Sequence, residues 1–526
     1  MKARLLLLIF NIFLIFFISF SQTSPIFQRS TDVCTKCKSY VPTSPLNSET
    51  AELRECLSYI NGTIVYRNND TYYESIKECN CRIMVYPLAI IYVNNTKDIQ
   101  EVVNCGNLLN ITVVVRSGGH SFENYSLGGK DGVLIIDLKN YNKITIDPIA
   151  QTAVVGAGNR IGPVYYTLNE AGFLFTAGSC PSVGVGGQTT GGGYGFIGPK
   201  YGMASDNILA AEVVLANGTI LPVVDNSTHS DLYFAIRGAG NGGFGVITLI
   251  TFQLYYIPPV MTWFNLSYDI AGRQNVFDAF NECGPKLAEN YSLYMTFLPN
   301  TFDKNNSCQT KEDYTLWSFG TFLGEEIEAR KGLKNFINHS APIIEPYFNQ
   351  TTWWETLVQF AAKEGSSDAL TNPSFDPEPF KAKSFFVDPP GLSYEGLEVL
   401  YNFINSVKCK IVVMFELYGG GKVNNIKPDL TAFMHRHSLA LLQLEMKLAG
   451  YDQEVVDECL AEFKVFGEEF QDKYTSYYSY QNYIDRELKD WQHRYYGNHF
   501  EKLVKIKAKY DPNNLFNWDQ SIPTSY

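Results

Sequence analysis

Short hydrophobic segments, separated by glycine, asparagine and aspartate, dominate the chain between Met84 and Pro258. They are rich in Val and Ile, as strands usually are. They occupy residues 85–93, 111–119, 132–138, 152–158, 208–218 and 245–254. Two segments between them, 96–110 and 161–172, carry the apolar spacing of helices instead. The pattern predicts an α+β domain with a mixed sheet over residues 84–258.

A second pattern begins after Pro258-Pro259, where the helical segments become longer. Helical spacing occurs in 272–290, 324–340 and 393–407, and strand-like spacing occurs in 292–298, 314–323 and 410–418. We therefore expect a second α+β domain to begin near residue 259.

Residues 439–448 contain good helix formers but follow the two-residue repeat of a strand. The side chains that share one face are Leu442, Leu444, Met446 and Leu448. Because every second side chain of a strand points to the same face, we expect a strand here. Residues 500–516 are expected to form a short helix that Asp511-Pro512 ends.

The N-terminus has the parts of a secretory signal peptide. Lys2 and Arg4 precede a largely apolar run over residues 5–20, and small and polar residues follow it. A membrane anchor is the alternative, but this run of 16 residues is shorter than the roughly 20 that span a bilayer. We expect residues 1–23 to be a signal peptide and the mature protein to be secreted and extracellular, without a membrane segment.

Twelve Asn-x-Ser/Thr sequons agree with passage through the secretory route, where N-glycosylation occurs. They lie at Asn61, Asn69, Asn94, Asn110, Asn124, Asn217, Asn226, Asn265, Asn290, Asn305, Asn338 and Asn349. We therefore expect a glycoprotein, although the sequence does not say which sequons carry a glycan.

Eleven cysteines in a secreted protein are expected to be mostly paired, and the odd number leaves at least one for another role. Five of them lie in residues 24–83, the predicted disulfide-rich N-terminal segment: Cys34, Cys37, Cys56, Cys79 and Cys81. Cys34-x-x-Cys37 could indicate a zinc or redox site, but no second pair matches it and the compartment is oxidising. Structural disulfides are the better interpretation, and the spacing leaves their pairing open.

The amino-acid composition excludes some classes of function. With 45% hydrophobic and 18% charged residues, the 526-residue chain can build a large core and is not a disordered protein. Its net charge of −12 argues against a nucleic-acid partner.

Two glycine-dense segments are the candidate ligand site: RSGGHSFENYSLGG at 116–129 and GSCPSVGVGGQTTGGGYG at 178–195. Glycines let backbone amides approach and bind a diphosphate. Neither segment is a P-loop, and AGNGGFG at 239–245 lacks the context of a dinucleotide-binding turn. Each segment places one reactive side chain among glycines, His120 and Cys180. Two such residues 60 positions apart make a poor metal site, so no metal is expected.

The chain resembles the berberine-bridge-enzyme-like branch of the flavin oxidoreductases that share the vanillyl-alcohol-oxidase fold. The resemblance runs from about Tyr86 to Pro523. It is carried by both glycine segments and by KYGMASDNILAAEVVLANG, DLYFAIRGAGNGGFGVIT and YYGNHFEKLVKIKAKYDPNNLFNWDQSIP. It implies an α+β fold with a two-part PCMH-type FAD-binding domain, formed by 84–258 and the C-terminal segment 485–526. An α+β substrate domain, an antiparallel sheet covered by helices, is inserted at 259–484.

The resemblance also implies FAD attached twice, with His120 bonded to the isoalloxazine 8α carbon and Cys180 to C6. The alternatives are a hydrogen-bonded loop histidine and a small buried hydrophobic cysteine. The implied diphosphate cradle, acting mostly through backbone amides, consists of Arg116, Ser117, Gly118, Gly119, Gly186, Gly187 and Gly191.

On the substrate side, Glu416 is an acid within the hydrophobic strand 410–418. Alternation places Val412, Met414, Glu416 and Tyr418 on one face. In the family, the strand before a Gly-Gly pair directs an acidic or amide group toward the substrate. The alternative is a surface carboxylate on an edge strand.

Tyr483 and Tyr480 lie where the family carries its catalytic tyrosine, and Tyr194 resembles another active-site tyrosine of the branch. A tyrosine acts as a base near neutral pH only if a positive charge or hydrogen-bond donors stabilise its phenolate. Tyr483 is the first choice as base and Tyr480 the second, with Glu416 as acid–base partner or orienter. Because the chain has 34 tyrosines, a core or surface role competes for each. His435 and His437 are interpreted as structural or surface residues.

The implied function is a secreted FAD-dependent oxidase that acts on an alcohol, with a carbohydrate hydroxyl as the best specific substrate. Oxygen accepts the electrons and hydrogen peroxide forms. Val183 stands where a small β-branched residue admits oxygen in this family and a leucine tends to block it. The alternatives are oxidative cyclisation or dehydrogenation of a specialised metabolite, such as an alkaloid or aromatic alcohol, and a non-catalytic glycoprotein. His120 and Cys180 argue against the last.

Overall fold

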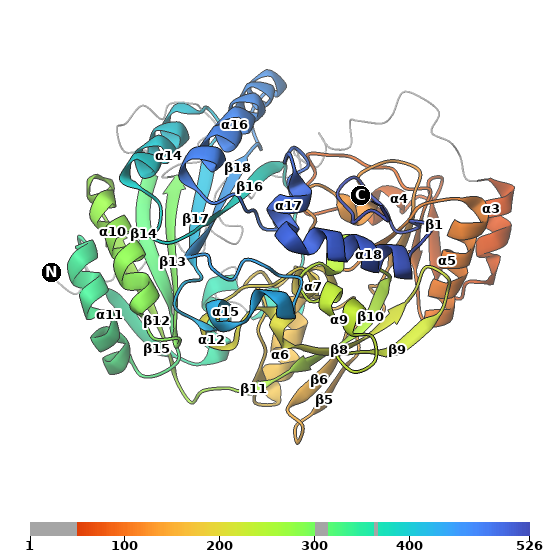
Figure 1. Ribbon diagram of the computed structural model, residues 1–526, viewed down its shortest axis with the longest axis horizontal. Coiled ribbons are helices and arrows are strands. Elements are labelled where there is room, and N and C mark those ends of the chain that lie inside the picture. Colours follow the sequence, from red (N-terminus) through yellow and green to blue (C-terminus); the bar gives the residue numbers. More distant parts are fainter. Residues whose placement is uncertain (1–49, 300–313, 362–366, 526) are drawn as a thin grey trace.

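The computed structural model describes residues 50–299, 314–361 and 367–525 (Figure 1). The predicted signal peptide, Cys34, Cys37 and the sequon at Asn305 lie outside these ranges. Within them, no helix is long and apolar enough to cross a membrane.

Two larger sheets form the part of the molecule that holds the glycine segments, beside a two-stranded sheet of β7 (Phe173–Leu174) and β11 (Tyr255–Tyr256). A four-stranded mixed sheet has the order β1-β2-β4-β3, with β2 and β3 parallel to β4 and β1 antiparallel to β2. Its strands are β1 (Thr63–Tyr66), β2 (Ala89–Tyr92), β3 (Val113–Arg116) and β4 (Leu134–Asp137), and helix α5 (Thr96–Leu109) packs against it. The expected mixed sheet is therefore present.

The second of these sheets is antiparallel and has five strands in the order β5-β6-β10-β8-β9. Its strands are β5 (Ile144–Asp147), β6 (Thr152–Gly156), β8 (Ile208–Val214), β9 (Ile220–Val224) and β10 (Val246–Gln253). Helix α6 (Ile161–Glu170) packs on it through Ile161, Val164 and Leu168. The C-terminal helices α17 (Trp491–Tyr496) and α18 (Phe500–Tyr510) return to this region and share a core with α9 (Ser230–Ile236).

The chain from residue 261 builds a seven-stranded antiparallel sheet in the order β15-β12-β14-β13-β17-β18-β16. The strands are β12 (Met261–Tyr268), β13 (Tyr291–Pro299), β14 (Tyr314–Phe322), β15 (Tyr347–Thr351), β16 (Phe380–Val387), β17 (Ile411–Leu417) and β18 (Ala440–Lys447). Helices α10 (Arg273–Cys283), α11 (Glu326–Ser340), α14 (Tyr394–Ser406) and α16 (Gln453–Tyr474) cover its outer face (Figure 1). The strand expected over 439–448 is confirmed as β18.

Helix α16 is the longest helix of the described residues, at 22 residues, and the apolar spacing did not predict it. Many of its positions are charged, and its buried contact is a narrow stripe that includes Phe463, Phe466 and Phe470. The stripe packs against the sheet through Phe385 and against Phe403 of α14. Because most of this helix faces solvent, its few buried apolar residues were too sparse to predict a helix from the sequence.

Within the described ranges, two disulfides join distant elements. Cys56 bonds to Cys105 of α5, and Cys409 bonds to Cys459 of α16. The expectation that the N-terminal cysteines form disulfides is wrong for Cys79, which is a free thiol. Its amide donates to Gly119 O at 2.9 Å and its carbonyl accepts from Glu378 N, so the backbone holds it beside the first glycine segment.

Candidate functional site

The two glycine segments, whose reactive residues His120 and Cys180 lie 60 positions apart in sequence, touch each other. A Cβ on Gly118 would lie 2.2 Å from the amide nitrogen of Gly184, so glycine is required there for two backbones to meet. Ser117 joins the same segments, because its Oγ donates to Ala157 O at 2.6 Å and accepts from Gly186 N at 3.3 Å. The resulting loop pair leads into helix α7 (Val185–Thr190).

Arg116 does not lie in this loop pair as a free cation. Its Nε contacts Asp137 at 2.6 Å and its Nη1 contacts Glu78 at 3.2 Å, and all three side chains are buried. Arg116 therefore anchors the end of β3, and its charge is already compensated. A direct role in binding a diphosphate is not supported.

The predicted cradle glycines have different surroundings. Gly119 has a φ of +69°, a conformation that glycine adopts without strain. A Cβ on Gly187 would meet only Asn241 Oδ1, at 3.6 Å, so this position borders open space. A Cβ on Gly191 would lie 2.0 Å from Asn482 Oδ1, so this glycine is needed for close packing against the segment of Tyr483. Gly187 fits a ligand cradle better than Gly191 does.

His120 is held with one ring nitrogen uncommitted. Its Nε2 is buried and has no hydrogen-bond partner among the described residues. Burial, with the nearby charge of Arg160, lowers the pKa of His120 to about 3, so its imidazole is neutral. Phe375 packs edge-on against the ring at 5.0 Å. A neutral imidazole with an unpartnered ring nitrogen can form a bond to a ring cofactor.

Cys180 is a free thiol in the second segment, and its residue is exposed. Its carbonyl accepts from the amide of Val183 at 3.3 Å. Val183 is partly buried against the core of the five-stranded sheet. The free thiol of Cys180 and the unpartnered Nε2 of His120, on loops that touch, fit a flavin held between them.

Glu416 lies on β17, an interior strand between β13 and β18, where it faces Tyr294 and Leu441 across the sheet. It is 7% exposed. The alternative of an edge-strand surface carboxylate is therefore wrong. Burial raises the pKa of Glu416 to about 7, although a hydrogen bond from Tyr483 opposes the rise.

The Tyr483 hydroxyl donates to Glu416 Oε1 at 3.0 Å, across 67 residues of sequence. Its ring stacks on Phe122, with centroids 5.4 Å apart and planes 4° from parallel. Burial and the neighbouring Glu416 raise the pKa of Tyr483 well above its ordinary value. The condition for a tyrosine base, stabilisation of the phenolate, is thus not met at Tyr483, because a carboxylate stands where a cation would be needed.

Tyr480 and Tyr194 make other contacts. The Tyr480 hydroxyl accepts from Gly193 N at 2.7 Å and from Asn482 Nδ2 at 2.9 Å, so it supports the end of the second glycine segment. Burial still raises its pKa above the ordinary value. The Tyr194 hydroxyl donates to the carbonyl of Leu417, and its ring packs on Tyr418 at 4.2 Å. Neither hydroxyl bonds to Glu416.

Residues that sequence reasoning missed help to build this site. Phe122 lies two positions after His120 and carries the ring on which Tyr483 stacks. Asn482 bridges Gln188 O and Asn241, and so joins the segment of Tyr483 to helix α7. Phe122 and Asn482 lie within two positions of His120 and Tyr483, and this closeness in sequence is the one signal that could have marked them. His435 is buried against Phe386 and His437 is exposed, as interpreted.

Comparison with known proteins agrees with this arrangement. Two family models match, one described as an FAD binding domain over residues 87–223 and one described as berberine and berberine like over residues 479–523. The solved structure of Physcomitrella patens BBE-like 1 is 32% identical, with a TM-score of 0.83 over 90% of this chain and 99% of that chain. The chain belongs to the berberine-bridge-enzyme-like family.

The names of other similar proteins indicate different substrates. Reticuline oxidase from Papaver somniferum is 29% identical over 83% of this chain and 84% of its own length. A chitooligosaccharide oxidase structure is 26% identical, with a TM-score of 0.80 over 90% of this chain and 99% of that chain. The protein is thus an FAD-linked oxidoreductase, and its predicted α+β flavoprotein fold is confirmed.

Proposed function

We propose that this family member is a secreted FAD-dependent oxidase that oxidises an alcohol with molecular oxygen and releases hydrogen peroxide. The observation that carries the proposal is the buried carboxyl group of Glu416, whose pKa of about 7 suits a base near neutral pH. Bound FAD would supply the hydride acceptor.

Glu416 takes the proton of the substrate hydroxyl in this proposal, and Tyr483 orients it. The hydrogen bond from Tyr483 fixes one carboxylate oxygen and leaves the other to accept a proton. These roles reverse the order expected from sequence, which placed the tyrosine first. The reason is electrostatic, since Glu416, with a pKa of about 7, is partly ionised at neutral pH, whereas Tyr483 keeps its proton.

His120 and Cys180 are proposed to attach the FAD twice, at the 8α carbon and at C6. The unpartnered Nε2 of His120 and the exposed thiol of Cys180 support this attachment. Ser117, Gly118 and Gly187 would provide backbone for the diphosphate. The contact of the two glycine segments brings these groups to one region.

The substrate class proposed is a carbohydrate hydroxyl, on a small sugar or an oligosaccharide. Gln443 and Glu445 are partly exposed and lie opposite Met414 and Val412 in register, on the sheet face that carries Glu416. Their polar groups suit a ligand rich in hydroxyls, and the likeness to a chitooligosaccharide oxidase points the same way. A specialised metabolite is the second candidate, favoured by the likeness to reticuline oxidase.

Secretion is supported by the exposure of the sequons. Asn124 and Asn265 are buried, whereas most others are at least partly exposed and can accept a glycan. The exposed ones are Asn61, Asn69, Asn94, Asn110, Asn217, Asn226 and Asn338.

The deciding experiment measures hydrogen peroxide from the purified glycoprotein over a panel of oligosaccharides and aromatic alcohols. Peroxide with sugars supports the carbohydrate proposal, and peroxide with aromatic alcohols alone supports the second candidate. Peroxide with no compound, combined with no flavin reduction under anaerobic conditions, would leave a non-catalytic glycoprotein.

Attachment is tested separately, without turnover. Acid-precipitated wild-type protein should stay yellow, and His120→Ala and Cys180→Ala should each retain flavin through the other bond. The double variant should release it. Free FAD in the wild-type supernatant would contradict covalent attachment.

A further inference from the structure

Seven charged side chains meet where the sheet with Glu416 adjoins the loop that carries His120. They come from four parts of the chain: Arg82, Glu123, Lys381, Lys383, Asp485, Arg486 and Glu487. Most are buried. Nothing in the chemistry proposed above uses this cluster.

Lys381 is the member that links the others. Its side chain is 1% exposed, and its Nζ lies 2.6 Å from Glu123 Oε1 and 2.5 Å from Asp485 Oδ1. Glu123 lies three residues after His120, and Asp485 lies two residues after Tyr483. One ammonium group therefore contacts both the loop of His120 and the segment of Tyr483. Lys381 is 258 residues from Glu123 in sequence and 104 residues from Asp485.

Three aromatic rings next to the charged cluster connect the same three segments of the chain. Phe122 precedes Glu123, Phe380 precedes Lys381, and Tyr483 lies close to Asp485 in sequence. Phe122 packs edge-on against Phe380 at 5.1 Å and face-on against Tyr483 at 5.4 Å. The position of the Tyr483 ring thus depends on the same three backbone segments that Lys381 joins.

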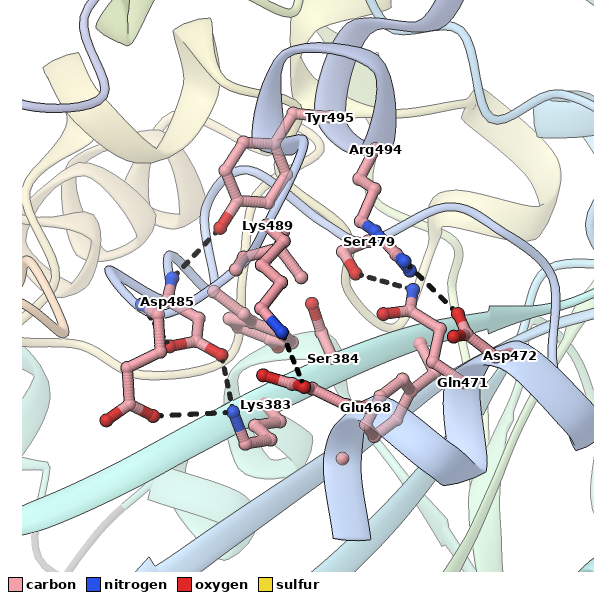
Figure 2. A pocket seen from close by; sticks show the side chains of 15 residues that line it. Lys383, Ser384, Glu468, Gln471, Asp472, Ser479, Asp485, Lys489, Arg494 and Tyr495 are labelled. Carbon is pink, nitrogen blue, oxygen red and sulfur yellow. Dashed lines mark hydrogen bonds and ion pairs between the residues drawn. The ribbon is translucent and has the colours of Figure 1, made fainter. Parts of the chain in front are cut away.

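Lys383 provides a natural comparison on the same strand. It contacts Asp485 Oδ2 at 2.8 Å and Glu487 at 3.6 Å, but it has no contact with Glu123 among the described residues. Lys383 and Asp485 line a polar pocket bounded by α16 and the C-terminal segment (Figure 2), whereas Lys381 and Glu123 do not line it. Water in this pocket can replace contacts of Lys383, but Lys381 has no such access.

We infer that Lys381 is a positioning residue, which fixes the loop of His120 and the segment of Tyr483 relative to each other. The inference rests on the proposed function, in which the loop of His120 attaches the flavin and the segment of Tyr483 orients the base. Without the ammonium group, Glu123 would keep Arg82 and Arg486, and Asp485 would keep Lys383. The two carboxylates would lose the buried cation that they share, so the loop and the segment would be held less firmly.

The test compares Lys381→Met with Lys383→Met in the flavin-loaded enzyme. Two quantities are measured: the fraction of flavin that stays attached after acid precipitation, and the pH profile of anaerobic flavin reduction. Lys381→Met should lower the attached fraction, slow reduction by roughly 10-fold to 100-fold and displace the midpoint of the profile, since small misplacements are costly. Lys383→Met should keep the attached fraction of the wild type.

Two further variants keep the inference testable if Lys381→Met does not fold. Lys381→Arg retains the charge and should restore both quantities, whereas Glu123→Gln removes the charge at the other end and should impair both. Equal effects of Lys381→Met and Lys383→Met, or wild-type values in Lys381→Met or Glu123→Gln, would overturn the inference. Wild-type enzyme without attached flavin and without a pH-dependent rate would overturn the proposed function first, and this inference with it.

Discussion

Replacement of Tyr483 by phenylalanine should move the pH profile of flavin reduction to higher pH. The hydroxyl of Tyr483 donates to Glu416 Oε1 at 3.0 Å, and this bond favours the ionised carboxylate. The variant keeps the ring that stacks on Phe122 and removes only the donor. Reduction needs the ionised base, so the rate should rise with pH through a midpoint of about 7 in the wild type.

The size of the shift follows from the strength of the bond. A hydrogen bond to a charged group contributes about 1.5–3 kcal/mol, and one pKa unit corresponds to about 1.4 kcal/mol. The pKa of Glu416 should therefore rise by about 1–2 units in Tyr483→Phe. At pH 7 the ionised fraction, and with it the rate, should fall roughly 5-fold to 50-fold, while the two enzymes should converge at high pH.

Anaerobic stopped-flow measurement of flavin reduction between pH 5 and about 10 provides the assay. Glu416→Gln should lose the titration and slow reduction by roughly 10²–10⁴-fold at all pH values. Tyr418→Phe is the matched control, because the Tyr418 hydroxyl is buried nearby without a hydrogen-bond partner among the described residues. Its midpoint should stay at that of the wild type. A midpoint that is unchanged or lower in Tyr483→Phe would refute the assignment of Glu416 as the base.

Three further outcomes are expected. Val183→Leu should slow the reaction of reduced enzyme with air while leaving anaerobic reduction unchanged, and equal reoxidation rates would remove the oxygen-gate role of Val183. Peptide mapping of the protein produced through a secretory route should find no glycan at Asn265, because this residue of β12 is 5% exposed. A glycan there would show that the strand is not formed when the glycan is added. Replacing both Cys56 and Cys105 by alanine should lower the free energy of unfolding by roughly 2–5 kcal/mol, measured by denaturant unfolding, because their bond closes a loop between residues 49 apart. A loss well below 1 kcal/mol would assign that bond no role in stability.

Local patterns in the sequence predicted many of the strands and singled out His120 and Cys180, but they missed other strands, among them β12 and β16. The alternation of apolar residues predicted β17 and β18, because side chains of a strand alternate between its faces whatever lies beyond. The glycine segments likewise marked His120 and Cys180, since close backbone contacts need glycine at fixed positions. These are short-range properties, and the sequence by itself determined them.

Only the tertiary structure decided how the acid–base groups behave. The pKa of Glu416 depends on burial inside a seven-stranded sheet and on a hydroxyl 67 residues away, and no local pattern records either. The same holds for Cys79, which the crowding of N-terminal cysteines marked for a disulfide but which is a thiol beside Gly119. No sequence pattern singled out Lys381, because its importance comes from carboxylates that two distant segments place against it. The pKa of a buried side chain and the position of its segment depend on solvent exclusion and on partners from far along the chain. Both are therefore determined only when the chain has folded.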